Sequence, residues 1–77
     1  MKEHDLVVLT HPSPEHGLEA GDVGTVVHCY GNGEAFEVEF TSAAARTIAV
    51  LTVEKEELRE LEEGEILHAR RLPATAT

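Results

Sequence analysis

The segments Gly31-Asn32-Gly33 and Ala35-Phe36-Glu37-Val38-Glu39-Phe40 decide the fold of this chain. Glycine and asparagine tolerate the positive φ angles of a tight turn, and here they separate two β-like runs, which predicts a hairpin. After the turn, Phe36, Val38 and Phe40 alternate with glutamates. Because successive side chains of a strand point to opposite faces, one face should contact a core and the other water. The chain therefore contains antiparallel sheet with one buried face.

Runs rich in β-branched and aliphatic residues predict three more strands, over 5–10, 23–30 and 47–53. Gly24 lies within the second run and marks either a β-bulge or a close approach to a neighbouring backbone. The run over 47–53 is apolar on both faces, which predicts a central or covered strand.

The segments between and after these strands are polar. Residues 15–22 contain two glycines and predict a long loop that brings Leu18 into the core. Residues 54–63 are good helix formers, but a helix here would be short and isolated, so we expect one helical turn leading into a brief strand over 58–61. Residues 65–77 predict an arm or an additional strand with a frayed end.

Composition limits the function. The chain has 77 residues, enough for one domain with one core, and its 15 acidic and 6 basic side chains give a net charge of −9. This charge repels phosphate backbones and argues against general nucleic-acid binding. The longest apolar runs are far below the ~20 residues that cross a bilayer. The single Cys29 forms no intramolecular disulfide and the N-terminus does not resemble a signal peptide, so we expect a cytoplasmic protein.

Three segments in order resemble a family of short bacterial and cyanobacterial proteins: Gly21-Asp22-Val23-Gly24-Thr25-Val26-Val27, Phe36-Glu37-Val38-Glu39-Phe40 and Ala49-Val50-Leu51-Thr52-Val53. The family is catalogued as a domain of unknown function with an SH3-like barrel, related in outline to KOW-type modules. The resemblance covers about residues 4–72. It implies an all-β, SH3-like small barrel of about five antiparallel strands over 1–64, with a short helical turn before the last barrel strand and a C-terminal arm over 65–77. The sequence departs from the family pattern at 42–45, where a glycine-containing turn is more usual.

No combination of residues predicts a catalytic or metal site. The five histidines and Cys29 match no zinc-ligand spacing. His28 follows strand alternation and should point away from Cys29, so it cannot activate the thiol. The glycines at 17, 21 and 24 precede a strand, whereas a phosphate-binding loop precedes a helix. We therefore expect no enzyme, no cofactor and no metal.

Charged residues in the C-terminal third have several interpretations. The glutamate-rich segment 54–65 predicts a solvated, charge-repelling face, with cation binding or imitation of nucleic-acid charge as alternatives. Arg70 and Arg71 are the only adjacent basic pair, and the chain's own glutamates are candidate partners for them.

These observations favour a non-catalytic protein-binding module with a basic or sticky partner protein. Toxin-like neighbours of some relatives imply an antitoxin- or immunity-like subunit whose partner is encoded by a neighbouring gene. Strand addition by the arm also predicts a homodimer. A KOW-like RNA- or ribosome-associated module is the alternative, against which the charge argues. Candidate partner-binding residues lie in the proline-containing loop, at the hairpin tip and on the arm: His11, Pro12, Pro14, His16, Tyr30, Asn32, Ile66, His68 and Arg70.

Overall fold

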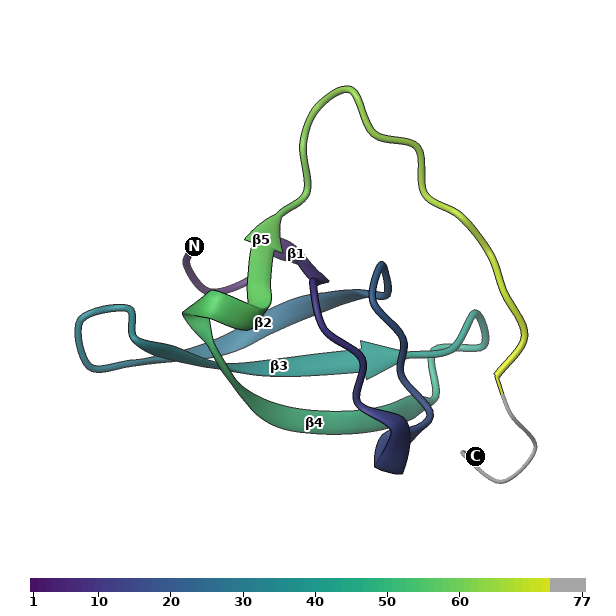
Figure 1. The fold of residues 1–77 in the computed structure, drawn as a ribbon, viewed down its shortest axis with the longest axis horizontal. Coiled ribbons are helices and arrows are strands. Elements are labelled where there is room, and N and C mark those ends of the chain that lie inside the picture. Colours follow the sequence, from purple (N-terminus) through teal and green to yellow (C-terminus); the bar gives the residue numbers. More distant parts are fainter. Residues whose placement is uncertain (73–77) are drawn as a thin grey trace.

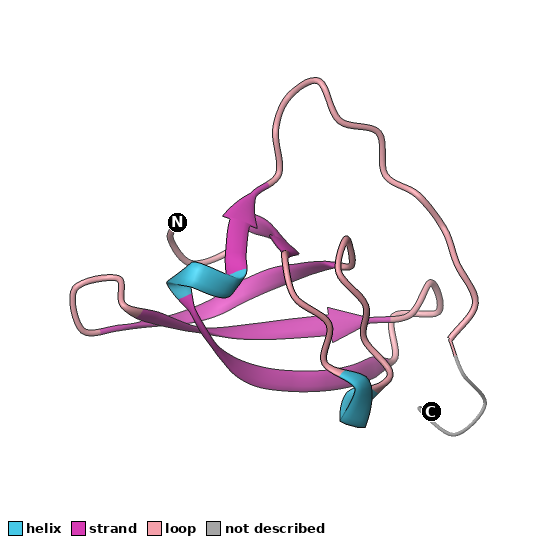
Figure 2. Cartoon of the chain, in the orientation of Figure 1, coloured by secondary structure: helices cyan, strands magenta, loops and turns pink. Residues whose placement is uncertain are grey.

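Five strands form one antiparallel sheet in the computed structural model, which describes residues 1–72 (Figure 1). The strands are β1 (Leu6–Leu9), β2 (Val23–Tyr30), β3 (Ala35–Thr41), β4 (Thr47–Glu54) and β5 (Leu58–Glu60). Two 3-10 turns, η1 (Pro14–His16) and η2 (Lys55–Glu57), are the only helical segments in this part of the chain (Figure 2). The predicted all-β class, the five antiparallel strands and the helical turn before the last strand are confirmed.

The sheet does not close into a barrel. Its order is β4-β3-β2-β1-β5, so β4 and β5 are the two edge strands. Over residues 1–72, β5 pairs with β1 alone. A barrel requires tilted strands that continue hydrogen bonding around the whole circumference, and β5 has only three residues. The expected barrel is therefore corrected to an open five-stranded sheet.

The apolar side chains that alternate with glutamates along β3 lie in the core. Its three large apolar side chains are each at most 2% exposed: Phe36, Val38 and Phe40. On the opposite face, Thr52 and Thr47 of β4 donate hydrogen bonds to the carboxylates of Glu37 and Glu39, at 2.6 and 2.7 Å. Leu18 is 3% exposed and packs in the same cluster, as predicted. The hydroxyl groups thus hold the two carboxylates of the outer face.

A β-bulge in β2 changes which side chains face the core. The register with β3 shifts between Val26 and His28, so that Val27 is the extra residue. Val26 is fully buried before the bulge and Cys29 packs against the core after it, although the two are three positions apart. The bulge lets both side chains face inward.

Gly24 allows β2 to approach the core side chains of β3. A Cβ at this position would lie 2.6 Å from Cγ1 of Val38 and 2.8 Å from Cε1 of Phe40. The same Cβ would lie 3.0 Å from the backbone carbonyl oxygen of Glu39, so of the two roles predicted for Gly24 the close backbone approach is confirmed, and the bulge lies further along the strand.

The expectation that the fourth strand is central or covered is wrong. β4 is an edge strand of the sheet, and Val50, on its outer face, is 47% exposed. Val53 points the other way and is buried. The apolar residues on both faces of β4 therefore do not reflect two covering layers.

The two hairpin turns differ in how they reach positive φ. Gly31 and Gly33 of the β2–β3 turn have φ angles of 55° and 83°, as glycines in the predicted turn should. In the β3–β4 turn, Ala45 has a φ of 62°. Its N–H donates to the carbonyl of Ser42 at 2.9 Å, and the Ser42 N–H donates to the carbonyl of Arg46 at 2.8 Å. This is the segment where the family pattern leads one to expect glycine.

Replacing Gly24 by alanine should destabilise the protein strongly. The new methyl group would overlap Val38 and Phe40 in a packed core, which should lower the free energy of unfolding by about 1–3 kcal/mol. Urea unfolding measures the change. The matched control is Gly64→Ala, because nothing lies within 4 Å of a Cβ at that position; equal losses in the two variants would contradict the close-approach argument.

Replacing Ala45 by glycine should stabilise the protein. Glycine adopts the left-handed conformation without steric cost, which should raise the free energy of unfolding by about 1–2 kcal/mol. Glycine also makes the unfolded chain more flexible, which offsets part of this, so the net gain should be up to about 1 kcal/mol. The neighbouring variant Ala44→Gly should lose stability. Thermal or urea unfolding of the two variants measures these changes. A loss of stability in Ala45→Gly as large as that in Ala44→Gly would contradict the prediction.

Candidate functional site

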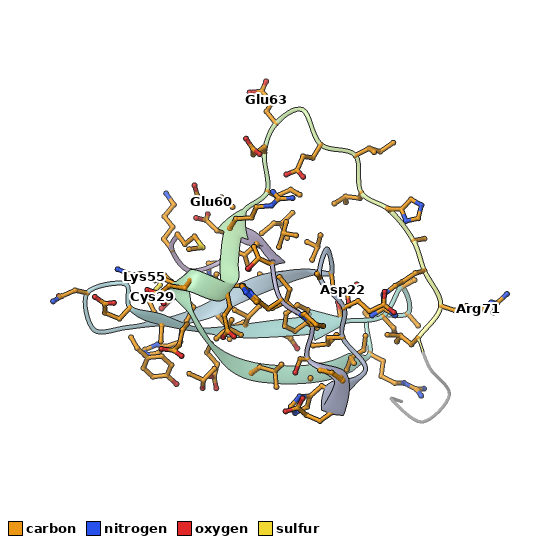
Figure 3. All side chains as sticks on the ribbon, viewed as in Figure 1. Asp22, Cys29, Lys55, Glu60, Glu63 and Arg71 are labelled. Atoms are coloured by element: carbon orange, nitrogen blue, oxygen red, sulfur yellow. The ribbon has the colours of Figure 1, made fainter. Side chains whose placement is uncertain are left out.

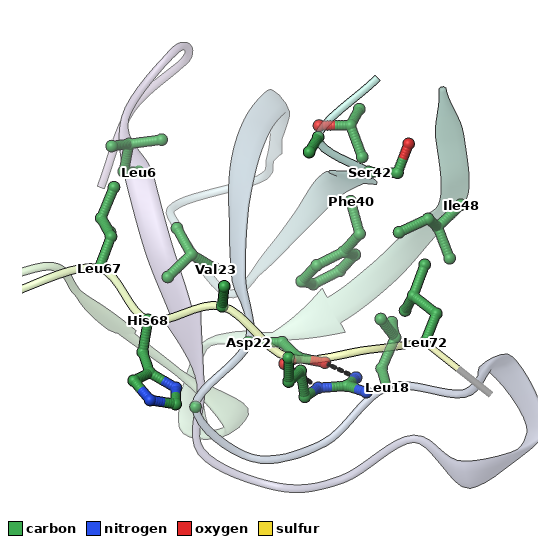
Figure 4. A pocket seen from close by; sticks show the side chains of 15 residues that line it. Leu6, Leu18, Asp22, Val23, Phe40, Ser42, Ile48, Leu67, His68 and Leu72 are labelled. Atoms are coloured by element: carbon green, nitrogen blue, oxygen red, sulfur yellow. Dashed lines mark hydrogen bonds and ion pairs between the residues drawn. The ribbon is translucent and has the colours of Figure 1, made fainter. Parts of the chain in front are cut away.

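An apolar groove of about 470 Å³ lies between one end of the sheet and the C-terminal segment (Figure 4). Side chains from β1, the loop before β2, β2, β3 and β4 line its sheet side: Leu6, Leu18, Val23, Phe40 and Ile48. Leu67 and Leu72 line it from the C-terminal segment. A concave site with aliphatic and aromatic walls and few polar groups suits a ligand with apolar side chains.

Residues 61–72 cover the groove, and from this point we call them the arm; they include residues 65–72 of the C-terminal arm predicted from the sequence. The arm contains no helix or strand, and it loops away from β5 before returning across the end of the sheet (Figure 1). At its base, both terminal nitrogens of Arg59 donate to the two carboxylate oxygens of Glu65, each at 2.7 Å. Figure 3 shows Glu63 at the outermost bend and the side chain of Arg71 pointing away from the sheet.

The arm is held by side chains beyond its base. From residue 66 to the end of the described chain, no backbone-to-backbone hydrogen bond connects it to the sheet. Ile66 is 90% exposed and Leu67 is 61% exposed. Its attachment to the rest of the chain therefore depends on Arg70 and on apolar contacts along the groove.

Arg70 joins the arm to the loop before β2 through a set of contacts that we call the arginine clasp. Its Nε donates to Oδ1 of Asp22 at 2.8 Å, and its Nη2 donates to Oδ2 of the same carboxylate and to the carbonyl of Gly17, the latter at 2.9 Å (Figure 4). Nη1 lies 3.6 Å from the Glu19 carboxylate. A planar guanidinium matches a carboxylate in this paired geometry, whereas an ammonium does not.

The turn before β2 holds Asp22 in place for the clasp. Gly21 has a φ of 98°, which allows the chain to reverse immediately before Asp22. The Glu19 N–H donates to the Asp22 carboxylate at 2.8 Å. Burial alone would raise the pKa of Asp22, but the hydrogen bonds from Arg70 and Glu19, together with the charge of Arg70, outweigh it and lower the pKa below its ordinary value. Asp22 is therefore ionised whenever the clasp is closed near neutral pH.

A family model described as a domain of unknown function, DUF4926, matches residues 3–60. The chain belongs to this family. No curated protein and no solved structure matches the chain. The DUF4926 match ends at the last residue of β5, so the arm lies outside it, while Asp22, Gly17 and Glu19 lie inside.

The predicted residues of the proline-containing loop lie beside a second, smaller cavity. His11 and Pro12 line this cavity of about 200 Å³ together with Leu51 and Val53. Pro14 begins η1, and Nδ1 of His16 lies 3.0 Å from the Ser13 hydroxyl. Of the four predicted loop residues, His11 and Pro12 therefore line a site distinct from the arm-covered groove, and Pro14 and His16 do not line it.

The predicted residues of the hairpin tip lie at the other end of β2 from the arginine clasp. Tyr30 is 41% exposed and contacts the ring of His28 edge-on, with 4.7 Å between the ring centroids. Asn32 is exposed within the turn. These two residues present an aromatic, polar surface that does not adjoin the groove.

The predicted residues of the arm have different surroundings. Ile66 and His68 are exposed, and the imidazole of His68 points away from Leu6 and Val23 (Figure 4). Arg70 lies in the clasp, with its side chain 24% exposed. The nine predicted residues thus lie on three surfaces, and only the arm surface adjoins the groove.

Sequence reasoning missed the residues that build the groove. In the sequence, Asp22 is typical of a turn, and the apolar residues that line the groove are typical of a hydrophobic core. The adjacent arginines indicated an ion pair within the chain, because an acidic chain offers them carboxylate partners. Which carboxylate pairs with Arg70 could not be inferred, since Asp22 lies 48 positions away.

The side chains of Cys29 and His28 have different surroundings. Cys29 packs against the core, while the His28 side chain is exposed with Nδ1 4.0 Å from the Glu3 carboxylate. Over residues 1–72, no three His, Cys, Asp or Glu side chains lie in a group that could hold a metal ion. No helix within this range is long and apolar enough to cross a membrane.

Asp22→Asn should weaken the attachment of the arm in a pH-dependent way. The folded-state pKa of Asp22 is lowered, so the stability that its charge contributes is present above the ordinary value of 3.8 and is lost as the pH falls through the folded value. The free energy of unfolding of Asp22→Asn should therefore lie below that of the wild type near neutral pH, and the difference should disappear in acid. Urea unfolding across this range measures it.

The control for this prediction is Glu63→Gln, which removes one negative charge from the exposed bend of the arm. It should show little difference from the wild type across the same range. The same pH profile in both variants would contradict the role of the clasp and would point to general charge repulsion.

Proposed function

We propose that this chain is a non-catalytic protein-binding module whose partner carries a basic surface. The observation that supports it most is the excess of unneutralised negative charge, with 15 acidic and 6 basic side chains. Three of the six basic side chains pair with carboxylates of the same chain: Lys55 with Glu34, Arg59 with Glu65 and Arg70 with Asp22. The field around the domain therefore attracts a basic protein and speeds its association.

Acidic side chains at one end of the sheet form the surface that we propose contacts the partner. Glu54, Glu56 and Glu57 are exposed at the passage from β4 through η2. Exposed carboxylates at this density favour a partner that presents lysines and arginines. They disfavour an RNA ligand, because its phosphates would meet like charge.

Two finer statements belong to this proposal. The first is that the partner is encoded by a neighbouring gene and that the chain acts as an antitoxin- or immunity-like subunit. The second is that the fold is an open member of the SH3-like class, which the strand order β4-β3-β2-β1-β5 and the 3-10 turn before β5 support. A homodimer through the arm and the KOW-like RNA module stay predictions from the sequence.

A tagged full-length chain should capture one stoichiometric basic protein from its native host at physiological salt. With that protein purified, calorimetry should give an affinity that falls as salt rises, because exposed charges are screened. Glu56→Gln combined with Glu57→Gln should weaken binding about two- to fivefold through the loss of two exposed charges.

The matched control is Arg46→Gln, which removes an exposed positive charge and should leave the affinity equal or higher. Recovery of RNA or ribosomes without a stoichiometric protein would overturn the proposal. An affinity that does not depend on salt or on these glutamates would remove the charge argument that supports it.

A further inference from the structure

We propose that the groove and the arginine clasp form a recognition site for an extended segment of the partner protein, in which one arginine lies between aliphatic residues. In this structure the arm occupies the site, and the partner segment replaces it. This inference rests on the proposed function and names the partner chemistry and a second binding surface, apart from Glu54, Glu56 and Glu57.

The polar end of the site selects a guanidinium. Asp22 offers two carboxylate oxygens, Gly17 offers a carbonyl, and the Glu19 carboxylate lies 3.6 Å from the outer nitrogen of Arg70. An arginine can satisfy these acceptors at once with its fixed fork of donors, whereas a lysine supplies a single point of charge. With Arg70 in place the Asp22 side chain is 18% exposed, so a segment that covers this site without a cation would leave the buried carboxylate with the Glu19 N–H as its remaining donor.

The apolar part of the site indicates the residues on either side of that arginine. Leu67, three positions before Arg70, and Leu72, two positions after it, both line the groove. About 470 Å³ remains open between these side chains and the sheet, so the arm fills the site incompletely. A partner segment with aliphatic residues at the same spacing and larger volume would bury more apolar surface.

The arm has the properties of a replaceable occupant. It lies outside the DUF4926 match, whereas the residues that receive Arg70 lie inside it. From residue 66 it makes no backbone-to-backbone hydrogen bond within the described chain, and Ile66 is 90% exposed. The Arg59–Glu65 pair fixes the base of the arm, so residues 66–72 can leave the groove without unfolding β5.

Charge favours a partner segment over a neutral ligand. When residues 66–72 leave, Arg70 and Arg71 move away from the sheet, and the site that remains has Asp22 and Glu19 without their cation. A basic segment from another protein restores the charge balance. The tethered arm competes at an effective concentration on the order of millimolar, which sets the affinity that the partner must exceed.

The test uses a synthetic peptide of residues 65–72 as a probe and the full chain with Arg70→Ala, which releases the arm. Titration of the isotope-labelled variant, followed by NMR, should shift the signals of Gly17, Asp22, Val23 and Ile48, with a Kd below about 1 mM. The wild type should bind the peptide at least about twofold more weakly, because its own arm competes at a millimolar effective concentration. Arg70→Gln serves as a second release variant where Arg70→Ala loses its folded spectrum.

Peptide variants test the selectivity of the clasp. The peptide with Arg70→Lys should bind at least about tenfold more weakly, and the peptide with Arg70→Ala should show no saturable binding. Adding Asp22→Asn to the Arg70→Ala protein should abolish binding of the unaltered peptide. Equal binding to wild type and variant, shifts confined to the outer face around Tyr30, or no binding to a folded release variant would overturn the inference.

Two further results separate this inference from the proposed function. A captured partner that binds wild type and Arg70→Ala equally, with no competition by the peptide, overturns the groove as the site while the module still binds proteins. The absence of any captured protein overturns the proposed function itself. A wild-type dimer with exchanged arms, detected by light scattering without peptide, would assign the groove to a second copy and overturn the partner segment.

Discussion

Burial of the β3 side chains against β2 is the constraint on which the other elements depend. Phe36, Val38 and Phe40 are almost fully buried, and each such side chain contributes about 1.5–3 kcal/mol when it leaves water. In a chain this small, the net stability is a small difference between large opposing terms, so the burial of each of these side chains is a large fraction of it. Gly24 is the residue that lets β2 approach them, since a methyl group there would overlap two of the three. The loop residue Leu18 then covers one end of the cluster.

The open form of the sheet explains why a groove exists. Since β5 is three residues long and pairs with β1, no strand within residues 1–72 covers the end of the sheet where β3 and β4 join. Apolar side chains such as Phe40 and Ile48 line that end, and the arm lies across them. A strand in that position would have been fixed by a ladder of backbone hydrogen bonds. The arm instead depends on one arginine and a few aliphatic contacts, which makes the cover removable without loss of the sheet.

Local patterns predicted the strands, and non-local contacts decided what the patterns could not. Alternation in 35–40 and the glycine turn at 31–33 specify β2 and β3 within a residue, because both signals lie within the hairpin itself. The position of β4 at the end of the sheet depends on which strands it pairs with, so its apolar outer residue Val50 was misleading. Closure of the barrel and the pairing of Arg70 with Asp22 likewise depend on contacts between distant segments. The family pattern did locate the strained turn, where Ala45 has the φ of a glycine.

The two ion pairs of the arm differ in how strongly solvent and salt act on them. At the base, the Arg59 and Glu65 side chains are 42% and 29% exposed, whereas Arg70 and Asp22 in the clasp are 24% and 18% exposed. Screening by salt weakens exposed pairs more than half-buried ones, so rising ionic strength acts first on the base. The clasp resists salt because water reaches it less. It opens instead when another guanidinium replaces Arg70 on Asp22, so the arm responds to the chemistry of a competing segment more than to the ionic medium.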